Sequence, residues 1–572
     1  MRQEAQPRIY SPILLQIGVI FLATLVAYAP ALQAGFIWDD DAYVTKNPLL
    51  TSPEGWSQIW FSTHHQSQYF PLVFSTLRLE YALWNLHPPG YHLVNILLHA
   101  TNASLILLLL RRLGLPGAWL AALLFALHPV QVESVAWVTE LKNTESTCFY
   151  LLALLIWIKS LDQAPARALR FYLLALVLYL LALFAKTTAC TLPAAMVVVL
   201  WLRRQRLTRK LWAQIGLFFV VGLAMGLVSV WWERHLGNYQ EKFGLHFTFI
   251  ERALIATRAV WFYLGKLVWP VDLTFSYPHW TIQPQRVLDY SWAIGCLGLS
   301  ALLWVKRREW RGVIAAAVFF VATLSPMLGF IPLFTFYYTF VADHYQYLAC
   351  LGPLTLFAAG VERLVQKAPD HRAALFGSSF LLVVVLGVLT WRQSHAYQNP
   401  ESLWRDTLKK NPDSWLAHCN LGVILAAGGD RAQAEAHYLE ALRLNPADGD
   451  TQYNFANLLV ATGRKAEAVD HYRQALSFRP DDAEMHNNFG VALFSLRQVD
   501  RAIEQFSQAI QLRPEHLSAH YNLAIAFEAR NQFTEAAREY SEVLKLDPNC
   551  APAQARLGVV RNKMQTEQPQ RP

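Results

Sequence analysis

Charged residues are scarce in this chain of 572 amino acids. Asp, Glu, Lys and Arg together make up 16% of it, whereas about a quarter is typical of soluble globular proteins. Hydrophobic residues account for 54%. This composition excludes an ordinary large soluble enzyme and indicates that much of the chain contacts lipid.

Cysteine is also sparse. The six cysteines are scattered at positions 148, 190, 296, 350, 419 and 550, with no Cys-x-x-Cys pair and no cluster with histidine. Neither a zinc site nor a disulfide framework is therefore supported.

The charges are unevenly distributed along the chain. Residues 1–397 contain 30 Lys and Arg against 19 Asp and Glu, a net charge of +11, and residues 398–572 contain 19 against 22, a net charge of −3. The positive excess lies between hydrophobic runs, so we do not interpret it as a nucleic-acid-binding surface. We expect a hydrophobic, basic domain over 1–397, a polar domain over 398–564, and a disordered tail over 565–572.

Long hydrophobic runs predict about eleven membrane spans. A helix of about 20 apolar residues crosses the hydrocarbon core of a bilayer. The run 12–32 has no charge and no convincing cleavage site, so we expect a retained span and not a signal peptide. The other ten spans are expected at about 92–112, 116–137, 144–160, 171–185, 188–202, 211–232, 290–305, 312–331, 341–360 and 373–391.

The stretch 251–271 is less apolar, because charged residues interrupt it at positions 251, 252, 258 and 266. We predict an interfacial or re-entrant helix there.

The basic loops predict the orientation of these spans. Five clusters rich in Lys and Arg follow even-numbered spans, at 111–112, 159–170, 203–210, 306–311 and 363–372, and such clusters favour the cytoplasmic side. We therefore expect a multi-pass protein of the plasma (inner) membrane with a cytoplasmic N-terminus. The loop 33–91 and the polar domain then lie outside the cytoplasm, and one miscounted helix would reverse the side of the polar domain.

The polar domain contains an internal repeat. Proline recurs every 34 residues at positions 412, 446, 480, 514 and 548, and 34 is the period of the tetratricopeptide repeat (TPR). Alanine at 434, 468, 502 and 536 and an aromatic residue at 438, 472, 506 and 540 keep the same phase. We predict four complete repeats over about 415–550, a preceding half repeat with Trp404 at the aromatic position, and a capping helix over 551–564.

Asparagine recurs at the same interval, as Asn420, Asn454, Asn488 and Asn522. TPR arrays form curved surfaces that typically bind peptide, and each carboxamide offers one donor group and one acceptor. These asparagines could bind the backbone of an acceptor polypeptide. A purely structural role for them is the alternative.

The loop after the first span begins with Asp39, Asp40 and Asp41. Three adjacent carboxylates repel one another, which should raise the pKa of at least one of them. A carboxylate at the membrane surface can accept a proton as a general base. A solvated acidic loop or a set of calcium ligands is the alternative.

Other polar residues are expected on the same side of the membrane, where ionisable groups near hydrocarbon are costly and often functional. They are Arg78, His128, Glu133, Lys142, Lys186, Asp343, His344 and Tyr345. A cation near the interface can bind a lipid phosphate. We therefore predict a site that combines a carboxylate with phosphate-binding cations. For a single His128 or Lys186, a satisfied structural residue is the alternative.

Several segments resemble a known family. The segment 36–48, which contains Asp39 and Asp40, is similar to the acidic first-loop motif of the glycosyltransferase C superfamily. The segments 90–99 and 128–137 are similar to transmembrane-and-TPR-containing protein O-mannosyltransferases and their bacterial relatives, and the likeness extends through 264–270 to 342–345. The order of these segments, together with the repeats, covers nearly the whole chain.

The resemblance implies an all-α fold, in which a polytopic helical bundle precedes a TPR solenoid. It also implies transfer of a sugar, mannose in the eukaryotic members, from a polyprenyl-phosphate donor to Ser or Thr hydroxyls of a protein. Asp39 or Asp40 would be the base, with Glu133 as a further catalytic residue. No cofactor or metal is expected beyond this donor substrate.

Two positions depart from the family pattern. Lys186 is followed by threonine where the family often has glutamate or proline, and His344 replaces an arginine. The donor phosphate would then be bound by Lys186, Lys142, Arg78 or protonated His344.

Two other classes of function are considered. A non-catalytic TPR scaffold anchored in the cell envelope has no need of an acidic triplet beside an apolar span. A transporter or flippase predicts charges at mid-membrane and repeated spans, whereas the charges here lie at span ends. The expected partners are the lipid bilayer, the polyprenyl-phosphate sugar and an acceptor polypeptide in the TPR groove, with no nucleic acid.

Overall fold

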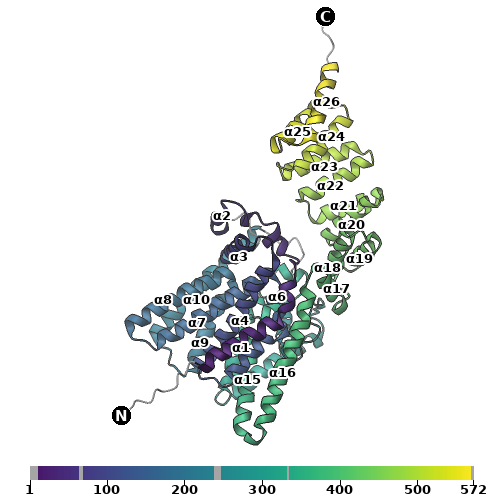
Figure 1. Cartoon of the computed structure of the whole chain (residues 1–572). Helices are drawn as coiled ribbons and strands as arrows, with labels where there is room; N and C mark the ends of the chain where they lie inside the picture. Colours follow the sequence, from purple (N-terminus) through teal and green to yellow (C-terminus); the bar gives the residue numbers. More distant parts are fainter. Residues whose placement is uncertain (1–10, 63–67, 237–245, 332–333, 568–572) are drawn as a thin grey trace. The chain divides into compact units, whose positions relative to one another are not determined.

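The computed structural model describes residues 11–62, 68–236, 246–331 and 334–567 (Figure 1). These residues form helices and connecting turns, and none of them forms a β-strand. The chain divides into two compact units, Met1–Pro412 and Asp413–Pro572, here called the membrane unit and the TPR unit. The all-α fold expected from the sequence is confirmed.

The boundary between the units lies later than the expected position at 397. The difference is helix α17 (Pro400–Lys410), whose Trp404 is buried against aromatic residues of the membrane unit. The tail expected to be disordered, 565–572, lies outside the described residues from 568 onward, and α26 reaches Glu567.

Six helices of the membrane unit are long and apolar enough to cross a bilayer. They are α4 (Pro88–Arg112), α7 (Leu141–Leu161), α8 (Pro165–Ala185), α10 (Arg209–Leu236), α13 (Ser291–Val305) and α16 (Arg372–Ser394), where short turns extend α7, α13 and α16. A seventh candidate is α5 (Ala118–Leu127) with the 3-10 turn η4 (Pro129–Gln131) and α6 (Val132–Ala136), which are bent by 54° at Pro129. These apolar helices indicate a membrane protein.

The other four predicted spans are shorter helices in the described residues. They are α1 (Ser11–Ala27), α9 (Leu192–Leu202), α14 (Arg311–Leu324) and α15 (Leu351–Lys367). Turns of 3-10 helix lie next to all four of them: η1 (Ala29–Gln33), η6 (Thr187–Thr191), η8 (Ser325–Met327) and η10 (Asp343–Gln346). Non-helical backbone at membrane depth is tolerated where protein surrounds it. Of the site described below, Lys186 directly precedes η6 and His344 lies in η10.

Helix α12 (Phe249–Val268) occupies most of the stretch predicted to be interfacial, and it is not among the candidate spans. Its charged residues have partners. Arg252 donates to the carbonyl of Gly329 at 2.8 Å, and the Arg258 guanidinium lies over the Trp280 ring at 4.4 Å.

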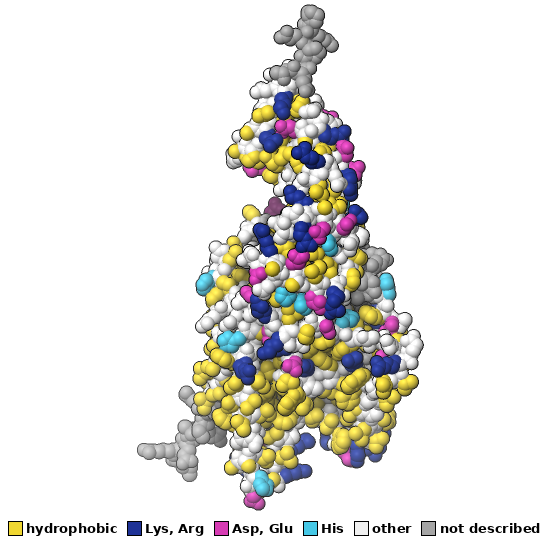
Figure 2. All heavy atoms as spheres, turned by 90° about the vertical axis from the view of Figure 1, so that its right-hand side faces the viewer, with side chains coloured by type: hydrophobic (Ala, Val, Ile, Leu, Met, Phe, Trp, Pro, Cys, Tyr) yellow, Lys and Arg dark blue, Asp and Glu magenta, His cyan; other side chains and the backbone are white. Residues whose placement is uncertain are grey.

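Several loops predicted to be cytoplasmic meet at one end of the bundle. Asp162, after α7, pairs with Arg112 at 2.9 Å and with Arg203 at 2.6 Å, at the ends of α4 and α9. Arg111 bonds to Gln16 of α1. Figure 2 shows a belt of hydrophobic side chains in its lower half with Lys and Arg at the lower edge. The ends of these helices therefore share one side of the bundle.

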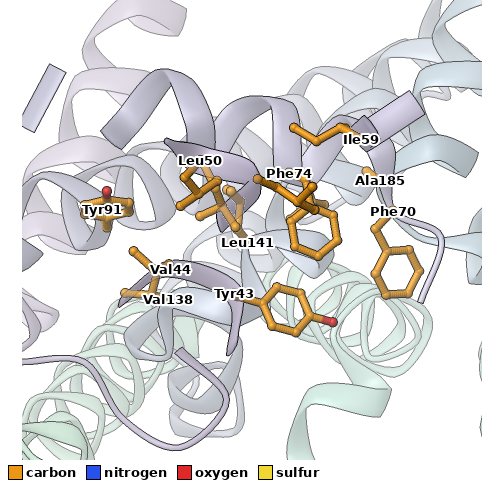
Figure 3. Close-up of a cluster of buried hydrophobic side chains, with 13 residues drawn as sticks. Tyr43, Val44, Leu50, Ile59, Phe70, Phe74, Tyr91, Val138, Leu141 and Ala185 are labelled. Atoms are coloured by element: carbon orange, nitrogen blue, oxygen red, sulfur yellow. The ribbon is translucent and has the colours of Figure 1, made fainter. Parts of the chain in front are cut away.

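The described residues of the loop 33–91, which are 33–62 and 68–91, are folded onto the other ends of the helices. This loop contains the π-helical turn η2 (Asp41–Thr45), the 3-10 turn η3 (Pro48–Leu50), α2 (Gly55–Phe61) and α3 (Pro71–Trp84). A buried hydrophobic cluster joins it to η5 (Val138–Glu140), to α7 and to Ala185 (Figure 3). In this cluster the rings of Tyr43 and Phe74 stack with centroids 5.1 Å apart. The cluster fixes the segment that follows the acidic triplet.

The TPR unit consists of four helix pairs and a terminal helix, as the repeat predicts (Figure 1). The pairs are α18 (Trp415–Ala427) and α19 (Arg431–Leu444), α20 (Gly449–Ala461) and α21 (Lys465–Phe478), α22 (Ala483–Ser495) and α23 (Val499–Leu512), and α24 (Leu517–Ala529) and α25 (Phe533–Leu546). The terminal helix α26 (Ala551–Glu567) covers the last pair through Leu557 and Val560.

The repeated aromatic residue fits against glycine in two of these pairs. A Cβ atom added to Gly422 would lie 2.7 Å from the Tyr438 ring, and one added to Gly490 would lie 2.6 Å from the Phe506 ring. The aromatic residue of the second helix therefore packs directly on the backbone of the first helix of its own repeat.

Gly490→Ala tests this close packing. Overpacking a core typically costs about 1–3 kcal/mol, and an alanine in a helix gains up to about 1 kcal/mol over glycine. We expect the free energy of unfolding of the TPR unit to fall by about 1–2 kcal/mol, measured by urea-dependent proteolysis of the full chain. The control is Gly558→Ala in α26, where no atom lies within 4 Å of the added Cβ. Equal stability of the two variants would contradict the packing described.

Candidate active site

Asp40 is fully buried and hydrogen-bonded on both carboxylate oxygens. Its Oδ2 accepts from the backbone N–H of Ile37 at 2.8 Å. Its Oδ1 accepts from the N–H of Thr139 at 2.9 Å and from the Thr139 hydroxyl at 2.6 Å. Burial raises the pKa of Asp40 to about 7, and the three hydrogen bonds oppose that rise. Asp40 thus anchors the loop after α1 to η5.

Asp39 differs from Asp40 in that no described residue donates a hydrogen bond to its carboxylate. The side chain is half-buried, and its backbone carbonyl accepts from Ala42 at 2.9 Å and Tyr43 at 3.0 Å. Burial raises the pKa of Asp39, and attraction to Lys142 opposes the rise. Asp39 is the member of the triplet with a carboxylate available for proton transfer.

Asp41 lies at the surface. It pairs with Lys46 at 2.6 Å and accepts from Thr45 at 2.7 Å. Although partial burial opposes it, the hydrogen bonds from Lys46 and Thr45 lower the pKa of Asp41. The three neighbouring aspartates therefore have three different environments.

Glu140 is at the centre of a buried group of charges close to Asp39. Its Oε1 lies 2.9 Å from Lys142 Nζ and 4.0 Å from His344 Nε2, and its Oε2 lies 3.7 Å from Lys186 Nζ. Asn143 donates to Glu140 and accepts from Lys186 at 2.7 Å. Burial lowers the pKa of Lys186 to about 8, and attraction to Glu140 opposes this shift.

Glu133 holds His344 in this group. Its Oε2 accepts from the backbone N–H of His344 at 2.9 Å, and its Oε1 lies 3.1 Å from Nδ1 of the same residue. Glu133 is 2% exposed. Glu133 therefore fixes the position of His344.

A cavity of about 210 Å³ opens beside these charges. Lys142, Lys186 and His344 line its polar side. Its other walls are mainly aromatic and aliphatic and include Tyr69, Phe70, Gly226, Val230, Trp232, Met327, Phe334 and Tyr345. An adjoining cavity of about 30 Å³ shares Lys186, His344 and Tyr345. The arrangement suits a ligand with an anionic group and an apolar part.

Not every predicted site residue belongs to this cluster. Arg78 donates to the backbone carbonyls of Leu49 and Ser52, so it holds the loop and does not line the cavity. Buried His128 bonds through Nε2 to the Leu267 carbonyl at 3.0 Å. The structure therefore supports the structural alternative for His128 and gives Arg78 no position for binding phosphate in this cavity.

Asp343 and Tyr345 flank His344 but point to other partners. Both carboxylate oxygens of Asp343 accept from the Tyr277 hydroxyl, at 3.1 and 3.0 Å. Tyr345 bonds to Thr335 and lines both cavities. Of the two, only Tyr345 is placed to contact a ligand in the cavity.

From the sequence, Glu140 and Asn143 belong with Lys142 to the polar residues expected on the outer side, just after Glu133. The sequence did not indicate that Glu140 is central to the site, and it gave no signal for Thr139. Among the described residues, no group of three or more His, Cys, Asp or Glu is arranged to hold a metal ion.

The asparagines of the TPR unit bond within their own array. Asn420 donates to the Leu416 carbonyl at 2.7 Å, Asn454 to Cys419 Sγ at 3.8 Å, Asn488 to the Tyr453 hydroxyl at 2.6 Å, and Asn522 to Asn487 Oδ1 at 2.9 Å. Three of the four therefore link one repeat to the preceding one. These bonds favour the structural role, and peptide binding through this row stays a prediction.

The fold and the site define a polytopic membrane protein with a C-terminal TPR array. Family models described as tetratricopeptide repeat match residues 415–448, 453–514 and 489–551. Two solved structures with similar repeats are YrrB, titled a TPR protein with an unusual peptide-binding site, and MamA. YrrB is 18% identical, and the match covers 34% of this chain and 97% of YrrB, with a TM-score of 0.26. MamA is 19% identical, and the match covers 27% of this chain and 89% of MamA, with a TM-score of 0.25.

The resemblance predicted from the motifs is confirmed, because the chain is similar to curated protein O-mannosyl-transferases. Protein O-mannosyl-transferase F38B6.6 of Caenorhabditis elegans is 23% identical, with 74% of this chain and 62% of the relative covered. Human TMTC1 is 26% identical, and the match covers 73% of this chain and 54% of TMTC1. Human TMTC4 is 25% identical, and the match covers 73% of this chain and 65% of TMTC4. The chain thus spans between 54% and 65% of the length of these relatives.

Asp40→Asn tests the anchoring role of Asp40. The substitution replaces one carboxylate oxygen of Asp40 by an N–H₂ group, which faces N–H or O–H donors and cannot accept from them. Leaving a buried donor unpaired costs about 1–3 kcal/mol of stability. We expect the thermal unfolding temperature of the purified protein to fall. Asp41→Asn is the matched control, because an exposed ion pair contributes only about 0–1 kcal/mol. The anchoring role would be wrong if both variants unfolded at the wild-type temperature.

Proposed function

We propose that the chain is a membrane glycosyltransferase of the glycosyltransferase C type. It would transfer a sugar, mannose by analogy with the relatives, from a polyprenyl-phosphate donor to Ser or Thr hydroxyls of a polypeptide. The observation that carries the proposal is the carboxylate of Asp39. It accepts no hydrogen bond from the described residues, and its charge interacts with Lys142 at the polar side of the cavity.

The transfer needs one base and a binding site for the leaving phosphate. Asp39 takes the proton of the acceptor hydroxyl while the hydroxyl oxygen bonds to the anomeric carbon of the sugar. The bond from that carbon to the phosphate oxygen breaks, and the polyprenyl phosphate leaves with the electron pair. Lys142 and Lys186 offset its negative charge. A phosphate is a good leaving group, so no general acid is required, and inversion at the anomeric carbon is expected by analogy.

The location of the reaction follows from the predicted orientation. We propose that the site faces the outer side of the plasma (inner) membrane and that the TPR unit binds the acceptor polypeptide there. TPR arrays commonly bind peptides, which supports this assignment. The shared end of the basic loops supports the orientation.

Burial of charge argues against a non-catalytic scaffold. Glu140 has no exposed surface, and Lys142 and Lys186 are nearly as buried. Removing such groups from water costs several kcal/mol per ion before pairing, and an anchor gains nothing from this cost. Absence of any sugar transfer by the wild-type protein, with donor and acceptor supplied, would favour the scaffold.

Asp39→Asn tests the proposed base. The amide cannot accept the hydroxyl proton, so we expect the transfer rate in membranes to fall by a factor of about 10²–10⁴. Asp41→Asn removes a neighbouring carboxylate of the same charge and serves as the control, with transfer expected near the wild-type rate. A wild-type rate in Asp39→Asn would remove Asp39 as the base.

The pH dependence of kcat/KM for the donor tests both charged partners. Asp39 must be ionised, so the rate falls as the pH drops through its raised pKa. Lys186 must be charged to bind phosphate, so the rate falls again as the pH rises through about 8. Lys186→Arg keeps its charge at all relevant pH values, so we expect the alkaline decline to move to higher pH. An unchanged alkaline decline in this variant would exclude Lys186 as its origin.

A further inference from the structure

Trp404 occupies the repeated aromatic position in a half repeat. In the complete repeats, Tyr438 and Phe506 pack on the first helix of their own pair. Helix α17 is preceded in the chain by α16 and the 3-10 turn η12 (His395–Tyr397) and not by the first helix of a repeat. Trp404 is 2% exposed. Its ring packs edge-on against the rings of Trp38 and Phe275, with centroid distances of 5.1 and 5.3 Å. The loop that carries Asp39 therefore takes the place of the missing helix.

Trp38, the residue before Asp39, has an unusual backbone conformation. Its φ angle is +48°, a left-handed conformation that bulky residues rarely adopt. Such a conformation persists where the surroundings enforce it. Besides Trp404, the Trp38 ring packs edge-on against the rings of Phe275 and Tyr338, whose centroids each lie 6.2 Å from that of Trp38. Packing around this ring thus holds the turn from which the Asp39 side chain projects.

Backbone bonds tie the same two segments together. The N–H of Gly35 donates to the carbonyl of Gln398, just before α17, at 2.8 Å. The segment that carries Phe275 is bound to the end of α17, because Lys410 donates to the Leu273 carbonyl at 2.7 Å and Asn411 to the Ser276 carbonyl at 3.0 Å. The contact between α17 and the Asp39 loop is therefore supported at several points.

Phe275 extends this packing to the other anchor of the loop. Its ring lies 5.0 Å from that of Trp137, which directly precedes η5, the turn that binds Asp40. Trp38, Trp137, Phe275 and Trp404 thus form one aromatic group that joins α17 to the residue before Asp39 and to the residue before η5.

We propose that Trp404 is a positioning residue for Asp39. By packing on Trp38, the last helix before the TPR unit fixes the turn that directs the Asp39 carboxylate toward the acceptor hydroxyl. The inference rests on the proposed function. It assigns to α17, a helix that belongs to the repeat pattern, a role in orienting the base.

The test uses the full chain in lipid vesicles, with polyprenyl-phosphate mannose and a short Ser/Thr peptide as substrates. A misplaced catalytic group can lose about 10²-fold in rate. We therefore expect Trp404→Leu to lower kcat at least about tenfold, with KM for the donor unchanged. The acid limb of the pH profile should move to lower pH, because water then reaches Asp39. Trp404→Phe keeps an aromatic ring and should recover most of the rate.

Trp157 provides the control for loss of a large buried ring. It has no exposed surface and lies in α7, fifteen residues from Lys142, or about 22 Å along the helix. We expect Trp157→Leu to unfold at a lower temperature while keeping the wild-type kcat and pH profile. A purely structural Trp404 would behave in the same way.

A measurement without turnover separates this inference from the proposed function. In the variant Asp39→Cys, maleimide labelling of position 39 is followed by mass spectrometry, with and without Trp404→Leu or Trp404→Phe. We expect labelling to be at least several-fold faster with leucine and nearly unchanged with phenylalanine. Unchanged labelling, or a wild-type kcat and pH profile in Trp404→Leu, would overturn the positioning role. Absence of transfer by the wild type would overturn the proposed function, and labelling would still decide on Trp404.

Discussion

The buried charge of Glu140 is the constraint on which the site depends. A carboxylate without exposed surface must be neutralised within the protein, and its partners Lys142 and Lys186 come from the ends of different helices. Their pairing fixes α7 relative to the turn that follows α8. Both lysines also line the cavity, where an anionic ligand can interact with their positive charge.

Neighbouring residues in the acidic triplet have different roles because their partners are distant in sequence. Asp40 bonds to Thr139, which lies 99 positions along the chain, whereas Asp41 bonds to Lys46 in its own turn. Asp39 has neither kind of donor. The sequence could therefore indicate the triplet as a site but could not distinguish the available carboxylate from the anchoring one. That distinction depends on tertiary hydrogen bonds that leave no local pattern.

The fold was predictable to the extent that it depends on local periodicity. The four repeats follow from a 34-residue spacing, and the long spans follow from apolar length. The break at Lys186 also agrees with the predicted spans 171–185 and 188–202. The 3-10 turn that carries His344 was less predictable, because it lies within the expected span 341–360 and surrounding protein satisfies its backbone groups. Arg78 and His128 were predicted at the site from their residue type and their expected place on the outer side, but backbone carbonyls bind both of them.

The size of the cavity limits what part of the proposed lipid-linked donor it could enclose. A volume of about 210 Å³ is below the roughly 300–1,000 Å³ typical of pockets that bury a drug-sized ligand, and it is too small for a long isoprenoid. The tail of a bound carrier would remain dissolved among the acyl chains of the bilayer. Discrimination between short and long carriers then has no steric basis inside this cavity, and the same architecture is compatible with polyprenols of very different length.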